Sequence, residues 1–281
     1  MRDASRTVWY LSLQDEWQFA RDWELTAGVR YDRYSDFGDT LNPRMALVWA
    51  ARHDLTAKIL YGRAFRAPSF IEQFSTNNPV ALGNPGLDPE TIDTFEVAVD
   101  YRPTFDLQTS LSVFTYHAKD LIEFIPDAGG ATRTARNARD QDGYGFEFEV
   151  DWRLRETLRL RGHYAWQRSE DAETKQRIAD APGQKVYLSA NWEFLPDWSI
   201  CPQYRWIGSR KRAGNDPRSA VDDYSLVDLA LRRDSILDHL NLALVVRNLF
   251  DKDAREPSNQ VIPGDYPLEG RQFLAEISYR F

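Results

Sequence analysis

The chain has 281 residues, of which 42% are hydrophobic and 28% are charged, with a formal net charge of −8 and one cysteine. The acidic balance argues against nucleic acid as a partner, and the single cysteine excludes a disulfide framework within the chain. Charges interrupt every candidate run of about 18 apolar residues, which excludes a transmembrane helix, while the apolar content argues against wholesale disorder.

A mean hydropathy of −0.57 remains compatible with a protein that crosses a membrane with β-strands. Such strands alternate lipid-facing apolar residues with polar residues that face the barrel lumen, so their average is hydrophilic. Aromatic residues make up 13% of the chain, as expected where girdles mark the two membrane interfaces. The basic residues are twenty-nine Arg and six Lys, and this excess of Arg favours paired charge networks or anion recognition.

Apolar and polar residues alternate with a period of two, and the pattern is first clear from residue 23. One phase of residues 23–32 reads Trp-Leu-Ala-Val-Tyr and the other reads Glu-Thr-Gly-Arg-Asp, so one face of this strand is apolar and the other polar. Residues 146–154 divide in the same way, whereas a helix would spread their acids around its circumference. With weaker examples included, the pattern predicts thirteen strands: residues 7–18, 23–32, 43–51, 55–63, 95–101, 107–125, 146–154, 158–166, 186–194, 198–207, 224–232, 240–246 and 273–281.

The connections between these strands alternate in length. Short ones are predicted at residues 20–22, 52–54, 103–104, 155–157, 195–197 and 234–239. Long ones are predicted at residues 35–42, 64–91, 127–136, 169–183, 211–223 and 250–271. Short turns at one end and long extracellular loops at the other are typical of a bacterial outer-membrane barrel. A soluble β-sandwich or propeller would also alternate, but it does not explain this rhythm or the aromatic residues gathered at both strand ends.

Four ordered segments resemble the TonB-dependent outer-membrane receptors. They are YGRAFRAPSF at residues 61–70, GNPGLDPE at residues 83–90, RNLFDK at residues 247–252 and the terminal stretch from Gly270-Arg271-Gln272 to Tyr279-Arg280-Phe281. The resemblance implies an antiparallel transmembrane β-barrel of 22 strands around an N-terminal plug. Bacterial single-chain barrels have even strand numbers, so thirteen strands are expected to be the C-terminal part of the barrel over residues 1–281, with the plug domain and first strands missing.

The same resemblance implies TonB-energised uptake of a scarce nutrient chelate, with an iron siderophore first and a cobalamin-like molecule second. Haem ranks lower, because no histidine lies between the FRAP sequence of residues 65–68 and the NPGL sequence of residues 84–87. An enzyme is not expected, since His163 lies in the polar phase of its strand without a serine partner, and no cofactor or metal site is predicted. A passive porin-like channel is the alternative function.

The expected location is the bacterial outer membrane, crossed several times. The expected partners are outer-membrane lipid, the TonB complex through the missing plug, a small-molecule metal chelate, and the barrel assembly machinery, which would read Phe281 as a C-terminal signal. Ligand contacts are expected from aromatic, amide and basic groups near the long loops, which suit stacking on a chelate and pairing with its negative charge. The candidates are Arg66, Phe70, Gln73, Phe74, Asn77, Asn78, Arg133, Arg136 and Arg139.

Overall fold

The computed structural model describes residues 4–76, 78, 80–179, 181–212, 216–236, 239–258 and 264–279. Within them, thirteen strands are joined in one sheet in the order β1-β2-β3-β4-β6-β7-β8-β9-β10-β11-β12-β13-β16, and the short strand β5 pairs with β8 outside this path. Each strand of the path is therefore hydrogen-bonded to the next strand of the path in chain order, with β5 and the β14–β15 pair left out. This confirms the all-β class and the thirteen successive strands predicted from the alternation.

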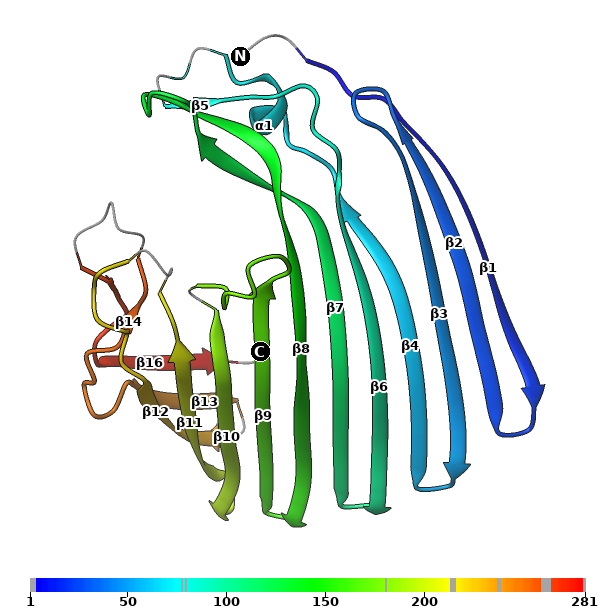
Figure 1. Ribbon diagram of the computed structural model, residues 1–281. Helices are drawn as coiled ribbons and strands as arrows, with labels where there is room; N and C mark the ends of the chain where they lie inside the picture. Colours follow the sequence, from blue (N-terminus) through cyan, green and yellow to red (C-terminus); the bar gives the residue numbers. More distant parts are fainter. Residues whose placement is uncertain are drawn as a thin grey trace. The chain divides into compact units, whose positions relative to one another are not determined.

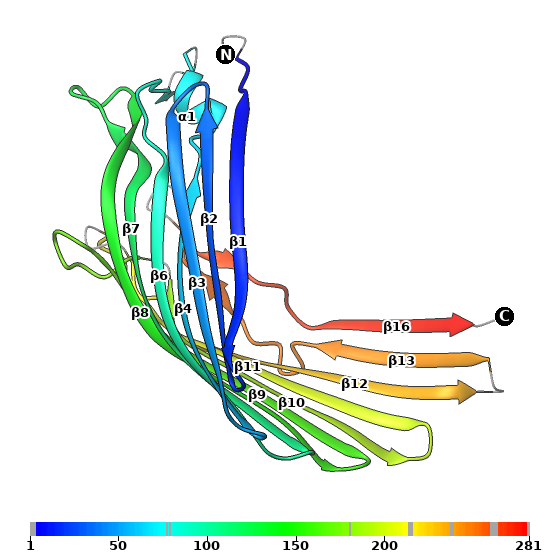
Figure 2. The ribbon, with the colours of Figure 1, turned by 90° about the vertical axis from the view of Figure 1, so that its right-hand side faces the viewer.

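The chain forms two compact units. The first contains the described residues of Met1–Ala98, Val113–Tyr144 and Ser169–Gln176, and the second those of Val99–Ser112, Gly145–Arg168 and Arg177–Phe281. Elements that lie wholly in the first unit are β1 (Val8–Ala20), β2 (Trp23–Tyr34), β3 (Gly38–Arg52), β4 (Leu55–Arg66), α1 (Phe70–Phe74) and β5 (Ala81–Leu82). In both ribbon views β1 to β4 lie side by side, with α1 at the end opposite the β1–β2 and β3–β4 turns (Figures 1 and 2).

Four strands contribute to both units: β6 (Glu90–Thr104), β7 (Leu107–Pro126), β8 (Arg133–Arg155) and β9 (Leu158–Asp171). The second unit alone contains β10 (Pro182–Leu195), β11 (Trp198–Arg210), β12 (Tyr224–Ile236), β13 (Leu240–Arg247), β14 (Arg255–Glu256), β15 (Tyr266–Pro267) and β16 (Gln272–Tyr279). Phe281 lies outside the described residues, so its predicted role stays a prediction.

The two faces of β1 to β4 differ as the alternation predicts. The registers bring Leu13 opposite Val29 on one face, and Trp23 stacks on Trp49 there at 5.1 Å between ring centroids. On β1, Leu11 is 75% exposed and Leu13 is 73% exposed. We call this the apolar face, and the opposite side, which carries Gln14, the polar face. An apolar face left open to the surroundings is what a lipid-contacting strand requires.

The strands are longer than the alternation predicts. The connection predicted at residues 35–42 is only the three residues between β2 and β3, because Tyr34 pairs directly with Gly38. The connection predicted at residues 127–136 ends where β8 begins, at Arg133. Both predictions of a long loop were wrong at these boundaries. Beyond the stretch in which one face is apolar, the strand ends carry polar residues on both faces. Apolar and polar residues therefore do not alternate there, and the sequence does not mark these ends as strand.

The connection from β4 to β6 has structure of its own. It contains α1, whose Ser69 accepts a hydrogen bond from the Glu72 amide at 3.3 Å while Glu72 Oε2 accepts one from the Ser69 amide at 2.7 Å. This reciprocal cap satisfies amides at the start of a very short helix. Among the described residues, no helix is long and apolar enough to cross a membrane.

Candidate ligand-binding surface

Arg66, the first predicted ligand contact, is held between two carboxylates. Its Nε donates to Glu90 Oε2 at 2.6 Å, and its Nη1 donates to Glu72 Oε2 at 3.0 Å. Glu90 also accepts a hydrogen bond from the Ile122 amide at 2.8 Å. Burial alone would raise the pKa of Glu72, but the hydrogen bonds from Arg66 and Ser69 outweigh it and hold the pKa below its usual value. The charge of Arg66 is thus already matched, and the FRAP and GNPGLDPE segments meet in this clasp.

Gln73 is held by Arg6, a residue that lies in none of the recognised sequence motifs. It is only 1% exposed, and its Oε1 accepts a hydrogen bond from Arg6 at 3.1 Å. Arg6 also donates to Asp36 at 2.7 Å and to the Pro68 carbonyl at 2.6 Å. The Arg6 guanidinium lies 5.0 Å from the centre of the Phe70 ring. Gln73 and Phe70 therefore fix the α1 segment to the outer ends of β1 and β2.

The remaining predicted residues of this connection also have local contacts. Phe74 packs near Phe70, with 6.1 Å between ring centroids. Asn78 Oδ1 accepts hydrogen bonds from the amides of Val80 at 2.9 Å and Ala81 at 3.0 Å, which forms a side-chain turn. Asn77 lies outside the described residues. The apolar side chains most open near this segment are Ile71 and Val80, each 59% exposed.

The three predicted arginines after residue 130 lie on β8 rather than in a loop. Arg139 pairs with Glu123, and Arg136 lies 3.5 Å from Asp127. Hydrogen bonds from Thr132 and Thr134 lower the pKa of Asp127, so this carboxylate stays charged beside Arg136. Arg133 is exposed, and no ion pair joins it to a carboxylate of the described residues. The structure therefore does not gather Arg133, Arg136 and Arg139 into one cationic site.

In the second unit, the RNLFDK segment is a loop anchor. Asn248 is buried, has a φ of +48°, and donates from Nδ2 to the carbonyls of Lys252 at 2.9 Å and Glu269 at 3.2 Å. Its Oδ1 accepts a hydrogen bond from the Lys252 amide at 2.8 Å. Asparagine adopts the left-handed backbone more readily than most residues, and its side-chain amide also makes these three hydrogen bonds. This residue was within a recognised motif, but its role was not predicted.

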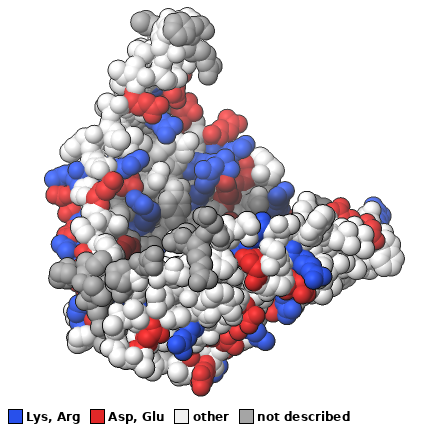
Figure 3. Space-filling view, turned by 90° about the horizontal axis from the view of Figure 1, so that it is seen from above, with Lys and Arg blue, Asp and Glu red and all other residues white. Residues whose placement is uncertain are grey.

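A second group of arginines fixes the loops around β14 and β15. Arg210 is buried over the ring of Tyr224 at 4.7 Å and donates to backbone carbonyls of Asp222 and Arg255. Arg218 donates to Asp216 at 2.6 Å, and this hydrogen bond lowers the pKa of Asp216 to about 2. Seen from above, Lys and Arg side chains lie beside Asp and Glu side chains (Figure 3). Most of the arginine excess thus serves intramolecular pairing.

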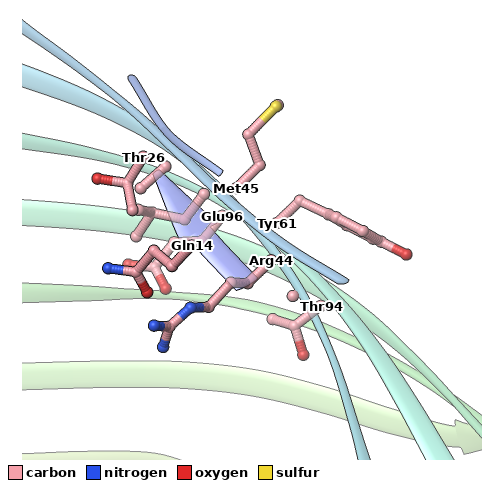
Figure 4. Close-up of a pocket in the computed structure, with 10 residues that line it drawn as sticks. Gln14, Thr26, Arg44, Met45, Tyr61, Thr94 and Glu96 are labelled. Atoms are coloured by element: carbon pink, nitrogen blue, oxygen red, sulfur yellow. The ribbon is translucent and has the colours of Figure 1, made fainter. Parts of the chain in front are cut away.

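A different environment surrounds Arg44, on the polar face of the first unit. A hollow of about 440 Å³ is lined there by Gln14, Thr26, Arg44, Thr94 and Glu96, together with small or apolar neighbours. In Figure 4 these five side chains point to one side of the strands, and Met45 and Tyr61 point to the other. Arg44 is exposed, and no ion pair joins it to a carboxylate of the described chain. Neither the motifs nor the loop predictions singled it out.

No cluster of three or more His, Cys, Asp or Glu side chains suited to a metal ion occurs among the described residues. Cys201 lies on β11 in the same alternating phase as Gln203 and Arg205, and its thiol is 3.1 Å from Asn191 Oδ1. His163 has Glu147 at 3.9 Å and no serine partner in the described hydrogen bonds.

The chain is similar in sequence to three kinds of curated protein. It is 26% identical to the iron-regulated outer membrane virulence protein of Vibrio cholerae, over 99% of this chain and 45% of the relative. It is 24% identical to the vitamin B12 transporter BtuB of the same species, over 99% and 43%. It is 27% identical to the metal-pseudopaline receptor CntO of Pseudomonas aeruginosa, over 91% and 39%. The chain thus spans less than half the length of these relatives.

Solved structures have the same fold. A variant of the ferric enterobactin receptor PfeA from Pseudomonas aeruginosa superposes with a TM-score of 0.83 and 21% identity, covering 99% of this chain and 45% of that one. The siderophore receptor PirA from Acinetobacter baumannii gives a TM-score of 0.82 and 18% identity, covering 98% and 46%.

The family model of the TonB-dependent receptor-like β-barrel matches residues 1–249. The match covers most of the chain and agrees with the antiparallel strands, the open apolar face and the ordered sequence segments. The chain belongs to the TonB-dependent receptor β-barrel family, whose members lie in the bacterial outer membrane and cross it with β-strands.

Proposed function

We propose that the receptor containing this chain takes up a scarce metal chelate in a TonB-dependent manner, with an iron siderophore as its substrate. The observation that carries the proposal is family membership over residues 1–249, together with relatives named as iron-regulated, vitamin B12 and metal-pseudopaline proteins. One of these relatives is named as a transporter and another as a receptor. Their named substrates differ, so a cobalamin-like chelate is the second candidate.

The structure supports the role of this chain as a wall rather than as the energy-coupling part. Its strands present an apolar face for lipid and a polar face with an exposed arginine in a hollow. In the proposal, energy passes from TonB through a plug domain to the bound chelate. The C-terminal strand would also be read by the barrel assembly machinery during insertion.

A passive porin-like channel is the competing function, and energy dependence separates the two. A channel passes solutes down their gradient without TonB, whereas a receptor concentrates a rare ligand against its gradient. No contact among the described residues favours the channel over the receptor.

The substrate is tested by growth. A strain that lacks its other iron receptors receives the complete gene containing this chain and is grown on single iron sources: a ferric catecholate, a ferric hydroxamate, haem, or ferric citrate. A parallel strain that needs cobalamin tests the second candidate. Growth on one of the siderophores supports the proposal, and growth on cobalamin alone would replace the iron substrate with the second candidate. Indifference to all of them in a strain with functional TonB would overturn both.

A further inference from the structure

Arg44 lies between two glycines in a row of paired residues that crosses β1 to β4. The registers pair Gln14 with Gly28, Gly28 with Arg44, and Arg44 with Gly62 across β1 to β4. A β-carbon at position 28 would lie 3.2 Å from Arg44 Nε and 3.3 Å from its Cγ, so the arginine side chain passes directly over Gly28. A β-carbon at position 62 would meet nothing within 4 Å. The guanidinium is thus supported by backbone on one side and has open space on the other.

The next row continues the same floor. Thr26 pairs with Ala46, and Ala46 pairs with Leu60. Thr26 and Ala46 have small side chains, so a hollow of about 440 Å³ stays unfilled beside Arg44. A planar group can lie against such a floor and still reach the N–H donors of the guanidinium.

Several other arginines of the first unit have their charge matched within the chain. Arg30 donates to Asp32 at 2.7 Å, and Arg63 donates to Asp93 at 2.9 Å. Arg66 is held by both Glu72 and Glu90. Arg44, like Arg133, has no carboxylate partner among the described residues, but of these two only Arg44 lines the hollow, which it shares with Glu96. Its donors are therefore available to a group from outside these strands.

We propose that Arg44 is a specificity residue that binds the anionic oxygens of a metal chelate as the chelate passes the polar face of β1 to β4. The class of ligand is an oxygen-rich anionic chelate that presents planar catechol or carboxylate groups, such as a catecholate or carboxylate complex of Fe³⁺. A guanidinium donates two parallel hydrogen bonds to adjacent oxygens of such a group, and each is strengthened by charge. The inference rests on the proposed function, since it specifies the charge of the substrate that the receptor takes up.

The test compares uptake of two iron chelates by the complete receptor in cells. One is a negatively charged ferric tris-catecholate, and the other is a neutral ferric tris-hydroxamate. Arg44→Gln removes the charge, Arg44→Lys keeps it without the planar fork, and Arg33→Gln removes an exposed charge from the opposite face of the neighbouring strand β2. For the catecholate, we expect Arg44→Gln to raise KM about tenfold, the loss expected for one hydrogen-bonded charge pair. Arg44→Lys should lie between it and the wild type, and Arg33→Gln should match the wild type.

The results that would overturn the inference are of three kinds. If Arg44→Gln raised KM equally for both chelates, or lowered the heat stability of the folded barrel, Arg44 would be a structural residue paired elsewhere in the protein. If the wild type took up only the neutral chelate, or if Arg44→Gln transported the catecholate normally, the anion assignment would fail while uptake itself stood. Uptake of neither chelate by the wild type would overturn this inference, and the growth test on the other iron sources and cobalamin would then decide the proposed function.

Discussion

The ring of Tyr116 on β7 lies directly over the backbone of Gly143 on β8. A β-carbon at position 143 would be 2.2 Å from Tyr116 Cε1, a separation that real side chains do not tolerate. The phenol oxygen lies 2.7 Å from Ser169 Oγ and accepts a hydrogen bond from Gln141 Nε2 at 2.7 Å. Glycine at 143 thus lets one aromatic ring bridge three strands of the first unit.

We expect Gly143→Ala to destabilise the folded barrel by about 1–3 kcal/mol, because the added methyl forces the ring away from its hydrogen-bond partners. The measurement is the temperature at which the purified protein loses its compact, fast-migrating form in detergent gels. Removing the ring with Tyr116→Ala should abolish most of the additional cost of Gly143→Ala. Equal costs in both backgrounds would show that the two positions are independent.

The clasp at Arg66 is expected to order the α1 segment rather than to bind ligand. Glu90→Gln removes one of its two carboxylates, so the segment of residues 66–76 should open more easily, by about 1 kcal/mol for a partly exposed network. Amide hydrogen exchange of that segment measures the change. Asp253→Asn, which removes an exposed carboxylate in the second unit, is the control and should leave exchange there unchanged. No effect of Glu90→Gln would mean that the pairing of Arg66 with Glu90 does not order this segment.

The same clasp predicts a dependence on pH. The pKa of Glu72 in the folded protein lies below its ordinary value of 4.5. A carboxylate with a lowered pKa contributes stability that is fully present above the ordinary value and is lost as pH falls through the folded value. Exchange of residues 66–76, corrected for its intrinsic pH dependence, should therefore accelerate on acidification below about pH 4.5. Glu72→Gln should remove that acceleration, and an unchanged acid response in this variant would assign it to another group.

Asn248 provides a test of the second unit. Asn248→Ala and Asn248→Gly both lose the three side-chain hydrogen bonds to the loop, and each should cost about 1–3 kcal/mol. Alanine is also strained by the positive φ of 48°, so Asn248→Ala should be less stable than Asn248→Gly by about 1 kcal/mol. Unfolding by urea in detergent micelles measures both variants. If alanine were as stable as glycine, the left-handed backbone would not be what selects asparagine here.

The sequence predicted the strands best where the bilayer imposes a rule. Residues 23–32 and 146–154 alternate because one face must meet lipid, and both lie within observed strands. The outer part of β8 was missed, since its residues from Arg133 onward are polar on both faces and are held by pairing with neighbours. The helix α1 was also missed, because its five residues are fixed by a cap and by Arg6 rather than by a periodic apolar stripe.

For the predicted ligand residues, the sequence does not show which partners they have within the folded protein. Arg66 and Gln73 have the chemistry to bind a chelate, but each has partners from segments distant in the sequence, Glu90 in one case and Arg6 in the other. A residue type does not reveal whether its partner lies inside the protein. Arg44 was overlooked for the converse reason: only the register that places Gly28 and Gly62 beside it shows that its surroundings are open. The ligand roles of the nine predicted residues stay predictions.

Energy dependence tests the central claim most directly. Cells that carry the complete gene are given a radiolabelled ferric siderophore at nanomolar concentration, and accumulation is followed in otherwise identical strains with and without TonB. A TonB-dependent receptor should accumulate iron in the first strain, while the second should show surface binding alone, and a protonophore should reduce the first to the second. Equal accumulation in both strains, rising in proportion to the external concentration, would contradict the receptor and identify a passive channel.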